Sequence, residues 1–105
     1  TFDLQTLKKT VEGNEPRFHE FLRSRLMSCA MYRLPAGATD MQPPHLEDEV
    51  YLVIEGRARL KIDDVEQEVA PGTVLFVAAT TEHSFFDITE DLTLLAMFGP
   101  ASGIR

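Results

Sequence analysis

Cysteine and long apolar runs are scarce in this chain. Its 105 residues include a single cysteine, Cys29, which excludes an intramolecular disulfide and is typical of a protein from a reducing compartment. The longest apolar runs, such as YLVI and LLAMF, are far too short to cross a bilayer. The N-terminal residues TFDLQTLKK lack the apolar stretch of a secretory signal. Together these absences favour a cytoplasmic protein with no membrane partner.

Positive charge is also in short supply. The chain has 10 lysines and arginines against 17 aspartates and glutamates, which gives a net charge of −7. Affinity for nucleic acid comes largely from basic side chains that displace counterions from phosphates, so this balance argues against a nucleic-acid partner. The basic residues are also not interleaved with aromatic residues, as they are on surfaces that stack bases.

Short β-strands account for most of the sequence. Residues 3–13 predict one short helix, with Asp3 as its N-cap and Gly13 at its end. Residues 17–24 fit either a helical turn or a strand. The later runs, separated by turn residues, predict strands at 26–34, 49–55, 57–63, 65–70, 74–78, 83–88 and 92–98. This pattern, in a chain of one-domain length, predicts an all-β sandwich or barrel with a short N-terminal helix.

Three polar residues suggest a metal site. His45 and Glu49 lie four residues apart and share strand parity, so an extended chain points both side chains to one face. His83 opens a later strand, which could lie beside them in a closed barrel. Two imidazoles and one carboxylate can occupy one face of a metal ion and leave its other positions open, as in non-haem Fe(II) sites.

These residues fit two motifs whose spacing resembles that of the cupin superfamily. The first motif runs Gly, five residues, His-x-His, three or four residues, Glu, six residues, Gly. The second runs Gly, five residues, Pro-x-Gly, two residues, His, three residues, Asn. The chain keeps every spacing, with the first motif at residues 37–56 and the second at residues 72–87. The resemblance implies a single cupin domain over residues 1–105, folded as a double-stranded β-helix, the jelly-roll-like cupin barrel.

The chain departs from the family pattern at the first ligand position. Pro43 stands where cupins usually carry their first histidine, and proline has no side-chain donor for a metal. The resemblance therefore implies that the usual three histidines and one glutamate are reduced to His45, Glu49 and His83 around one divalent transition metal. Fe, Mn, Ni, Zn and Cu all suit such nitrogen and oxygen ligands. The alternative is a degraded site that binds no metal.

Smaller departures surround these ligands. Gln42, beside the missing ligand, is either a weak fourth ligand through its amide oxygen or a solvated loop residue. In the second motif, Ala78 and Thr80 replace the usual proline and glycine, and Asp87 replaces asparagine.

Two aromatic residues are candidates for substrate contact. Tyr51 shares the strand parity of Glu49, and Phe85 shares that of His83, so both are expected to line the barrel interior. A phenylalanine at such a position is more often a core residue, so Tyr51, whose hydroxyl needs a partner, is the better candidate for substrate contact. The leading interpretation is metal-dependent chemistry on a small molecule, as an oxygenase or an isomerase. The alternatives are a non-catalytic module that binds a small molecule, and a metal-free isomerase or epimerase with a histidine as general base.

Two strands are apolar on both faces, which predicts a partner subunit. If Glu49 points inward, then Val50, Leu52 and Ile54 point outward, and residues 92–98 are also mostly apolar on both faces. Strands of this kind must be covered on both sides. A second copy of the chain is the simplest cover, so we expect a homodimer; the alternative is that the N-terminal helix covers the outer face.

Overall fold

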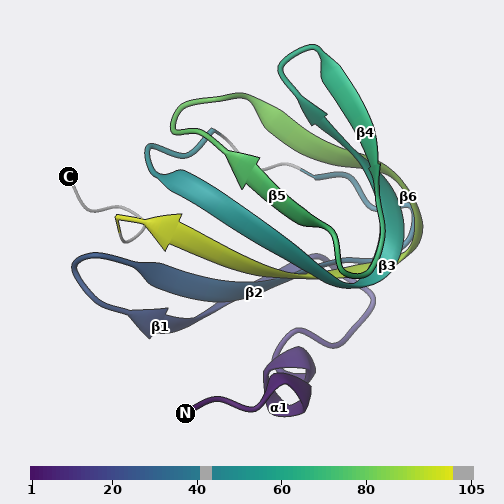
Figure 1. The fold of residues 1–105 in the computed structure, drawn as a ribbon. Coiled ribbons are helices and arrows are strands. Elements are labelled where there is room, and N and C mark those ends of the chain that lie inside the picture. Colours follow the sequence, from purple (N-terminus) through teal and green to yellow (C-terminus); the bar gives the residue numbers. More distant parts are fainter. Residues whose placement is uncertain (41–43, 101–105) are drawn as a thin grey trace.

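Six strands and one short helix make up the part of the chain that the structure describes. The computed structural model describes residues 1–40 and 44–100. The elements follow the order drawn in Figure 1: α1 (Leu4–Lys9), β1 (Arg17–Arg23), β2 (Ser28–Leu34), β3 (Asp48–Ile62), β4 (Val65–Val69), β5 (Val74–Val77) and β6 (His83–Gly99). The ambiguous segment at residues 17–24 is therefore a strand. None of the described residues belongs to a helix long and apolar enough to cross a membrane.

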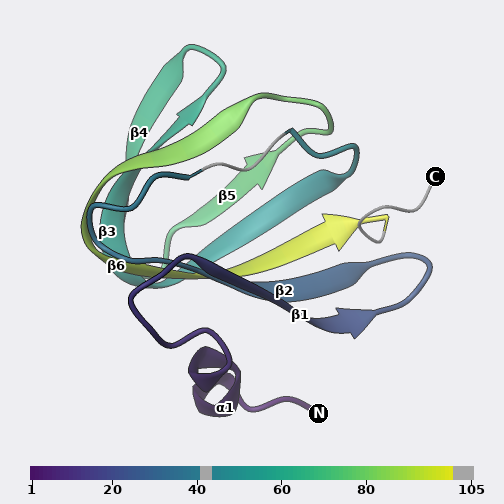
Figure 2. The ribbon, with the colours of Figure 1, turned by 180° about the vertical axis from the view of Figure 1, so that it is seen from behind.

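The strands form one antiparallel sheet that bends over into two facing layers. Its order is β1-β2-β6-β3-β4, and β5 pairs with β3 as well. The first half of β3 and the last half of β6 lie with β5, β2 and β1, while the other half of β3 lies with β4 and the start of β6. Figures 1 and 2 show the two layers facing each other, with α1 outside them. This is the predicted double-stranded β-helix with a short N-terminal helix.

The bend of β3 corrects one prediction. Gly56 was expected to end a strand, but β3 runs through it as one strand of 15 residues. A side chain at this position would clash, since a Cβ atom would lie 2.2 Å from the backbone oxygen of Asp91, and the φ angle is +98°. Glycine thus lets β3 fold over β6 without a break in the sheet.

The same bend reverses which residues face the barrel interior. Before it, Tyr51 and Val53 are buried, and after it Ala58 and Leu60 are buried, so the inward parity changes from odd to even. The register between β3 and β6 shifts around the bend, which accounts for the change because one extra residue moves every later side chain to the other face. Both halves of β3 can therefore contribute to one core.

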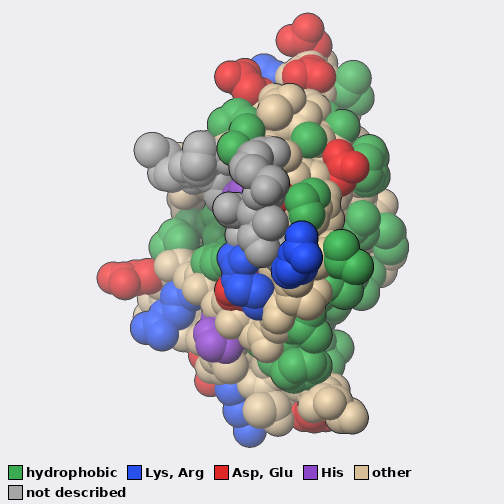
Figure 3. Space-filling model, turned by 90° about the vertical axis from the view of Figure 1, so that its left-hand side faces the viewer, with side chains coloured by type: hydrophobic (Ala, Val, Ile, Leu, Met, Phe, Trp, Pro, Cys, Tyr) green, Lys and Arg blue, Asp and Glu red, His purple; other side chains and the backbone are tan. Residues whose placement is uncertain are grey.

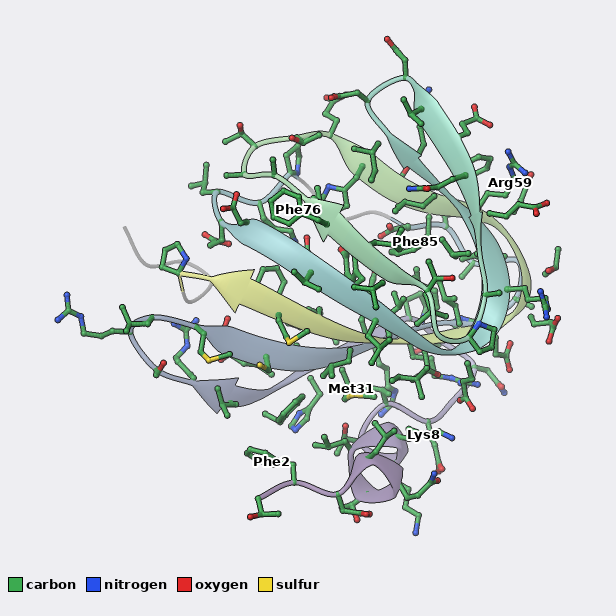
Figure 4. All side chains as sticks on the ribbon, in the orientation of Figure 1. Phe2, Lys8, Met31, Arg59, Phe76 and Phe85 are labelled. Atoms are coloured by element: carbon green, nitrogen blue, oxygen red, sulfur yellow. The ribbon has the colours of Figure 1, made fainter. Side chains whose placement is uncertain are left out.

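The helix packs against one part of the outer face only. Asp3 caps it as predicted, accepting a hydrogen bond from the backbone of Thr6, but the helix ends at Lys9, earlier than expected. Lys8 pairs with Glu55 at 3.0 Å and fastens the helix near the bend. Met31 is fully buried on the side of β2 that faces α1 (Figure 4).

Another part of the outer face remains apolar and open to solvent. On β5, Val74 is 66% exposed and Phe76 is 61% exposed, and they pair with Leu52 and Val50 on β3. Figure 3 shows hydrophobic side chains gathered along the edge that corresponds to the front of Figure 1. The helix thus does not cover this surface, which we call the β3–β5 face.

Candidate metal centre

Three predicted ligands meet at one end of the barrel. Glu49 is the second residue of β3, His83 is the first of β6, and His45 lies in the segment that leads into β3. One donor atom from each side chain lies within 4.8 Å of the others. Donors held about 2.0–2.2 Å from a common ion would lie roughly 3.0–3.5 Å apart, so a modest contraction would complete the site. The structure thus brings the three predicted side chains together.

Glu49 is the residue that most clearly calls for a cation. Its side chain is 1% exposed, and among the described residues neither carboxylate oxygen has a hydrogen-bond donor. The Nε2 atom of His83 lies 3.3 Å from its Oε1 atom, which is an electrostatic contact. Without a metal, a protonated His83 is the neighbour that can offset the burial of this carboxylate, and a bound cation would offset it instead.

The hydrogen bonds of His83 determine which of its nitrogens faces the site. Its Nδ1 atom lies 2.9 Å from the backbone oxygen of Thr81, which can only accept, so Nδ1 carries a proton. In the neutral ring Nε2 then has a free lone pair, directed toward Glu49 and the hydroxyl of Tyr51 at 3.2 Å. This is the tautomer that a metal ligand requires.

The same surroundings favour a proton on His83 when no cation is bound. Burial alone would lower the pKa of His83, but the Glu49 carboxylate, the Thr81 carbonyl and the charge of Asp40 together raise it above its usual range. Protons and metal ions therefore compete for Nε2 at near-neutral pH.

His45 is the predicted ligand that faces solvent, with a side chain 19% exposed. Its ring packs edge-on against Phe98, with 4.9 Å between the ring centroids. Its Nδ1 atom lies 3.9 Å from a carboxylate oxygen of Glu47, and its backbone oxygen accepts a hydrogen bond from Thr80. These contacts hold the ring at the edge of the barrel, where a small molecule could reach the site.

The charges around the site also fit a divalent cation. Glu47 is 3% exposed and Glu49 is 1% exposed, and Asp40 lies close enough to influence His83. Three carboxylates thus surround two imidazoles in a largely buried space. Even two protonated histidines would leave this group with a net negative charge, and a divalent ion would offset it.

Of the other predicted site residues, the structure describes Tyr51 and Phe85 but not Gln42. Tyr51 and Phe85 are both buried, face the interior, and pack edge-to-face with 5.2 Å between their ring centroids. Figure 4 shows Phe85 between the two layers. Gln42 and Pro43 lie outside the described residues, so the weak fourth ligand stays a prediction.

Sequence reasoning missed two carboxylates of the site. Glu47 shares the parity of His45 and Glu49, and that signal could have identified it. Asp40 had no such signal, because its position depends on contacts with distant strands, Tyr32 on β2 and Phe85 on β6.

The departures in the second motif have a backbone explanation. Thr80, where the pattern has glycine, adopts a φ angle of +63°, and Asp87, where it has asparagine, adopts +47°. Glycine, asparagine and aspartate tolerate this left-handed region, whereas a β-branched residue is strained there. Asp87 is thus a conservative replacement, and Thr80 is a strained one.

We therefore expect Thr80→Gly to stabilise the protein. Relief of the left-handed strain, of about 1–2 kcal/mol, outweighs the extra entropy of glycine in the unfolded chain, so the net gain should be about 0.5–1 kcal/mol. Urea denaturation of the metal-free protein measures it. Thr81→Gly, at a neighbour without a positive φ angle, is the control and should lower the midpoint. An unchanged or lower midpoint in Thr80→Gly would contradict the assignment of strain.

Comparison with known proteins gives one family and several structural relatives. A family model described as "Cupin domain" matches residues 30–98. The uncharacterized protein SCO3923 of Streptomyces coelicolor is 42% identical over 99 residues, which cover 94% of each chain. The match to this relative therefore extends over nearly the whole chain.

Solved structures share the fold at lower identity. TT1209 from Thermus thermophilus has a TM-score of 0.80 at 22% identity, over 96% of this chain and 97% of that one. A cupin superfamily protein from Desulfitobacterium hafniense has a TM-score of 0.76 at 20% identity, over 89% and 86% of the two chains. DMSP lyase DddQ from Ruegeria pomeroyi has a TM-score of 0.75 at 16% identity, over 81% and 47%. Such identities support the fold alone.

Proposed function

The chain belongs to the cupin family, and we propose that it binds one divalent transition metal through His45, Glu49 and His83 and acts on a small molecule as an oxygenase or an isomerase. The observation that carries this proposal is Glu49, a buried carboxylate that has no hydrogen-bond donor among the described residues and lies beside two imidazoles. Nitrogen and oxygen donors suit Fe, Mn, Ni, Zn or Cu.

Each residue has a distinct task in this proposal. Glu49 supplies the anionic oxygen, and His83 supplies Nε2, which its bond to the Thr81 carbonyl keeps directed into the site. His45 supplies the third donor from the solvent side. A metal bound by three protein ligands keeps positions open for a substrate and polarises the groups bound there.

Tyr51 is the group best placed to move a proton. Its hydroxyl lies 3.2 Å from Nε2 of His83, and its side chain is fully buried. It would donate a proton to a substrate beside the site, or accept one from it, while Phe85 packs against its ring and fixes its position. Both residues would then line the space that the substrate occupies.

The tyrosines offer a direct test of metal binding. The chain has no tryptophan and two tyrosines, and both lie near the site: Tyr51 contacts His83, and Tyr32 donates to Asp40. Titration with Co²⁺ should therefore change tyrosine emission with a stoichiometry of about one ion per chain, and elemental analysis of protein purified without chelator or His-tag should agree. An unchanged emission and a metal-free protein would contradict the proposal.

A second candidate function needs no metal. Tyr51, His83 and Glu49 form a continuous series of contacts, at 3.2 Å and 3.3 Å, which is a suitable arrangement for acid–base isomerisation or epimerisation with His83 as the base and Glu49 as its partner. Removal of metal with a chelator distinguishes the two functions. Turnover that persists without metal supports the metal-free isomerase or epimerase, and turnover that is lost supports the metal-dependent enzyme.

The pH dependence of metal binding follows from His83. Its pKa is raised in the folded protein, so protons occupy Nε2 at pH values up to and above the ordinary ~6.5. We expect Co²⁺ affinity to rise between pH ~6 and ~8, and to fall by at most about tenfold per unit on acidification for one displaced proton. Chelator competition measures it, and a flat profile would exclude His83 as a ligand.

The stability of the metal-free protein should depend on pH in the opposite sense. The pKa of His83 is higher in the folded protein than in the unfolded chain, where it is ~6.5. Such a group stabilises the folded protein fully at pH values below ~6.5, and this stabilisation is lost as the pH rises through the pKa of the folded protein. The metal-free melting temperature should therefore decrease over the window in which Co²⁺ binding increases. Melting curves with and without Co²⁺ provide this comparison.

A further inference from the structure

The described parts of the segment that carries His45 have no regular structure of their own. It connects β2, in one layer of the barrel, to β3, and its described residues belong to no strand or helix between Leu34 and Asp48. A ligand on such a segment keeps its position only if other contacts hold the backbone. After His45, the Thr80 amide donates to the His45 backbone oxygen, and the Ala79 amide donates to the side chain of Asp48 at 2.9 Å.

Asp40 provides the corresponding attachment before His45. Its Oδ1 atom accepts a hydrogen bond from the Tyr32 hydroxyl at 2.8 Å, and its Oδ2 atom accepts one from the Phe85 amide at 3.0 Å. Tyr32 lies on β2, in one layer of the barrel. Phe85 lies two residues beyond His83, in the first half of β6, which belongs to the other layer. One carboxylate thus joins both layers and the metal-binding segment.

We infer that Asp40 is a positioning residue of the site, which holds the segment of His45 against the strand of His83 through its bonds to Tyr32 and to the Phe85 amide. The inference rests on the proposed metal site, because a fixed His45 matters chiefly for binding a ligand. Asp40 is not itself one of the three clustered donors, since both of its oxygens are directed at protein groups.

The two hydrogen bonds of Asp40 can be tested separately from its negative charge. In Asp40→Asn, the amide oxygen still accepts from the Phe85 amide, and the NH₂ group donates to the Tyr32 hydroxyl, which can rotate to accept. Asp40→Asn therefore keeps the attachment and removes the charge, whereas Asp40→Ala removes both. Tyr32→Phe removes one bond and serves as a milder variant if Asp40→Ala fails to fold.

Asp91 supplies a matched control. Its carboxylate accepts a hydrogen bond at 2.8 Å from the Ala36 amide, at the start of the same segment, but it lies on the outer surface, beside Arg33. Asp91→Ala thus loosens the same segment at a point away from the site. The circular dichroism and melting temperature of Asp91→Ala show how a loosened segment affects folding when the contacts of Asp40 are intact.

The experiment measures Co²⁺ affinity in these variants. Asp40→Ala should bind Co²⁺ about tenfold or more weakly than wild type, and Tyr32→Phe should be intermediate. Asp40→Asn, which loses the charge but keeps the attachment, should lose clearly less affinity than Asp40→Ala, and Asp91→Ala should stay within about threefold. If Asp40→Ala binds like Asp91→Ala, the inference is overturned. If Asp40→Asn is as weak as Asp40→Ala, charge rather than position is responsible, and the inference is also overturned.

Amide hydrogen exchange of the metal-free proteins gives a second, independent readout. Asp40→Ala should accelerate exchange at Phe85 and at Thr80, whose amide is bonded to His45, and Asp91→Ala should not. If wild type binds no Co²⁺, the proposed function fails, and this measurement still decides on Asp40. Unchanged exchange at both amides in Asp40→Ala would refute its positioning role.

Discussion

His83→Ala is expected to abolish tight Co²⁺ binding. Only His45 and Glu49 would remain as donors, and the lost group is the buried imidazole whose Nε2 faces the site. Loss of a direct ligand should exceed the roughly 10–100-fold that loss of an outer contact costs, so we expect more than about a hundredfold weakening. Titration followed by tyrosine emission measures it.

The variant needs a folding control, because it also leaves Glu49 without its contact to His83. Removal of one partner from a buried ion pair can cost about 3–5 kcal/mol. His45→Ala is the milder alternative, since its side chain is 19% exposed, and it should also weaken binding strongly. His19→Ala, on the exposed surface of β1, should bind like wild type. Equal affinity in wild type and a folded His83→Ala would refute the ligand assignment.

Sequence reasoning grouped the three candidate ligands because their signal is local. Strand parity relates His45 to Glu49, and the motif spacing puts His83 at the start of a later strand, where β6 begins. Local sequence patterns also predicted that the side chain of Tyr51 points into the barrel and that Asp3 caps the helix, and the structure shows both.

The features that sequence reasoning did not predict depend on contacts between segments far apart in the sequence. Gly56 signals a strand end in any local pattern, but here the close approach of Asp91 requires it in the middle of one strand. Asp40 became part of the site through contacts such as those with Tyr32 and Phe85, which are brought to it by the fold. The sequence shows that Thr80 replaces the glycine of the family pattern, but the strain itself became evident only from its φ angle of 63°.

The second large effect concerns assembly: we expect the chain to form a homodimer, and Leu52→Glu to convert that dimer into a monomer or an aggregate. The β3–β5 face carries Leu52 and Val50 beside Val74 and Phe76, and the last two are 66% and 61% exposed. On the other side of β3, Leu52 pairs with Leu95 of β6, so the apolar surface continues across three strands. Soluble monomers avoid contiguous apolar patches of this kind.

A second copy of the chain is the cover that we expect for this face. Two sheets can stack face to face about 10 Å apart, and a two-fold axis would bring the same apolar residues together from both copies. The residues Val50, Leu52, Val74 and Phe76 are uncharged, so a chain with a net charge of −7 can approach its copy here with the least repulsion. A stable interface needs about 600–800 Å² from each partner.

The substitution acts twice in such a dimer, because a symmetric interface contains position 52 of both chains. Each glutamate would lose water without gaining a partner, at a cost of at least a few kcal/mol, so the dissociation constant should rise by more than about a hundredfold. Gln67→Glu, on exposed β4, adds the same charge elsewhere and should leave the dimer intact. Light scattering at micromolar concentration measures the mass. A wild-type mass of 11.8 kDa, that of one chain, would show that the β3–β5 face is not a self-interface.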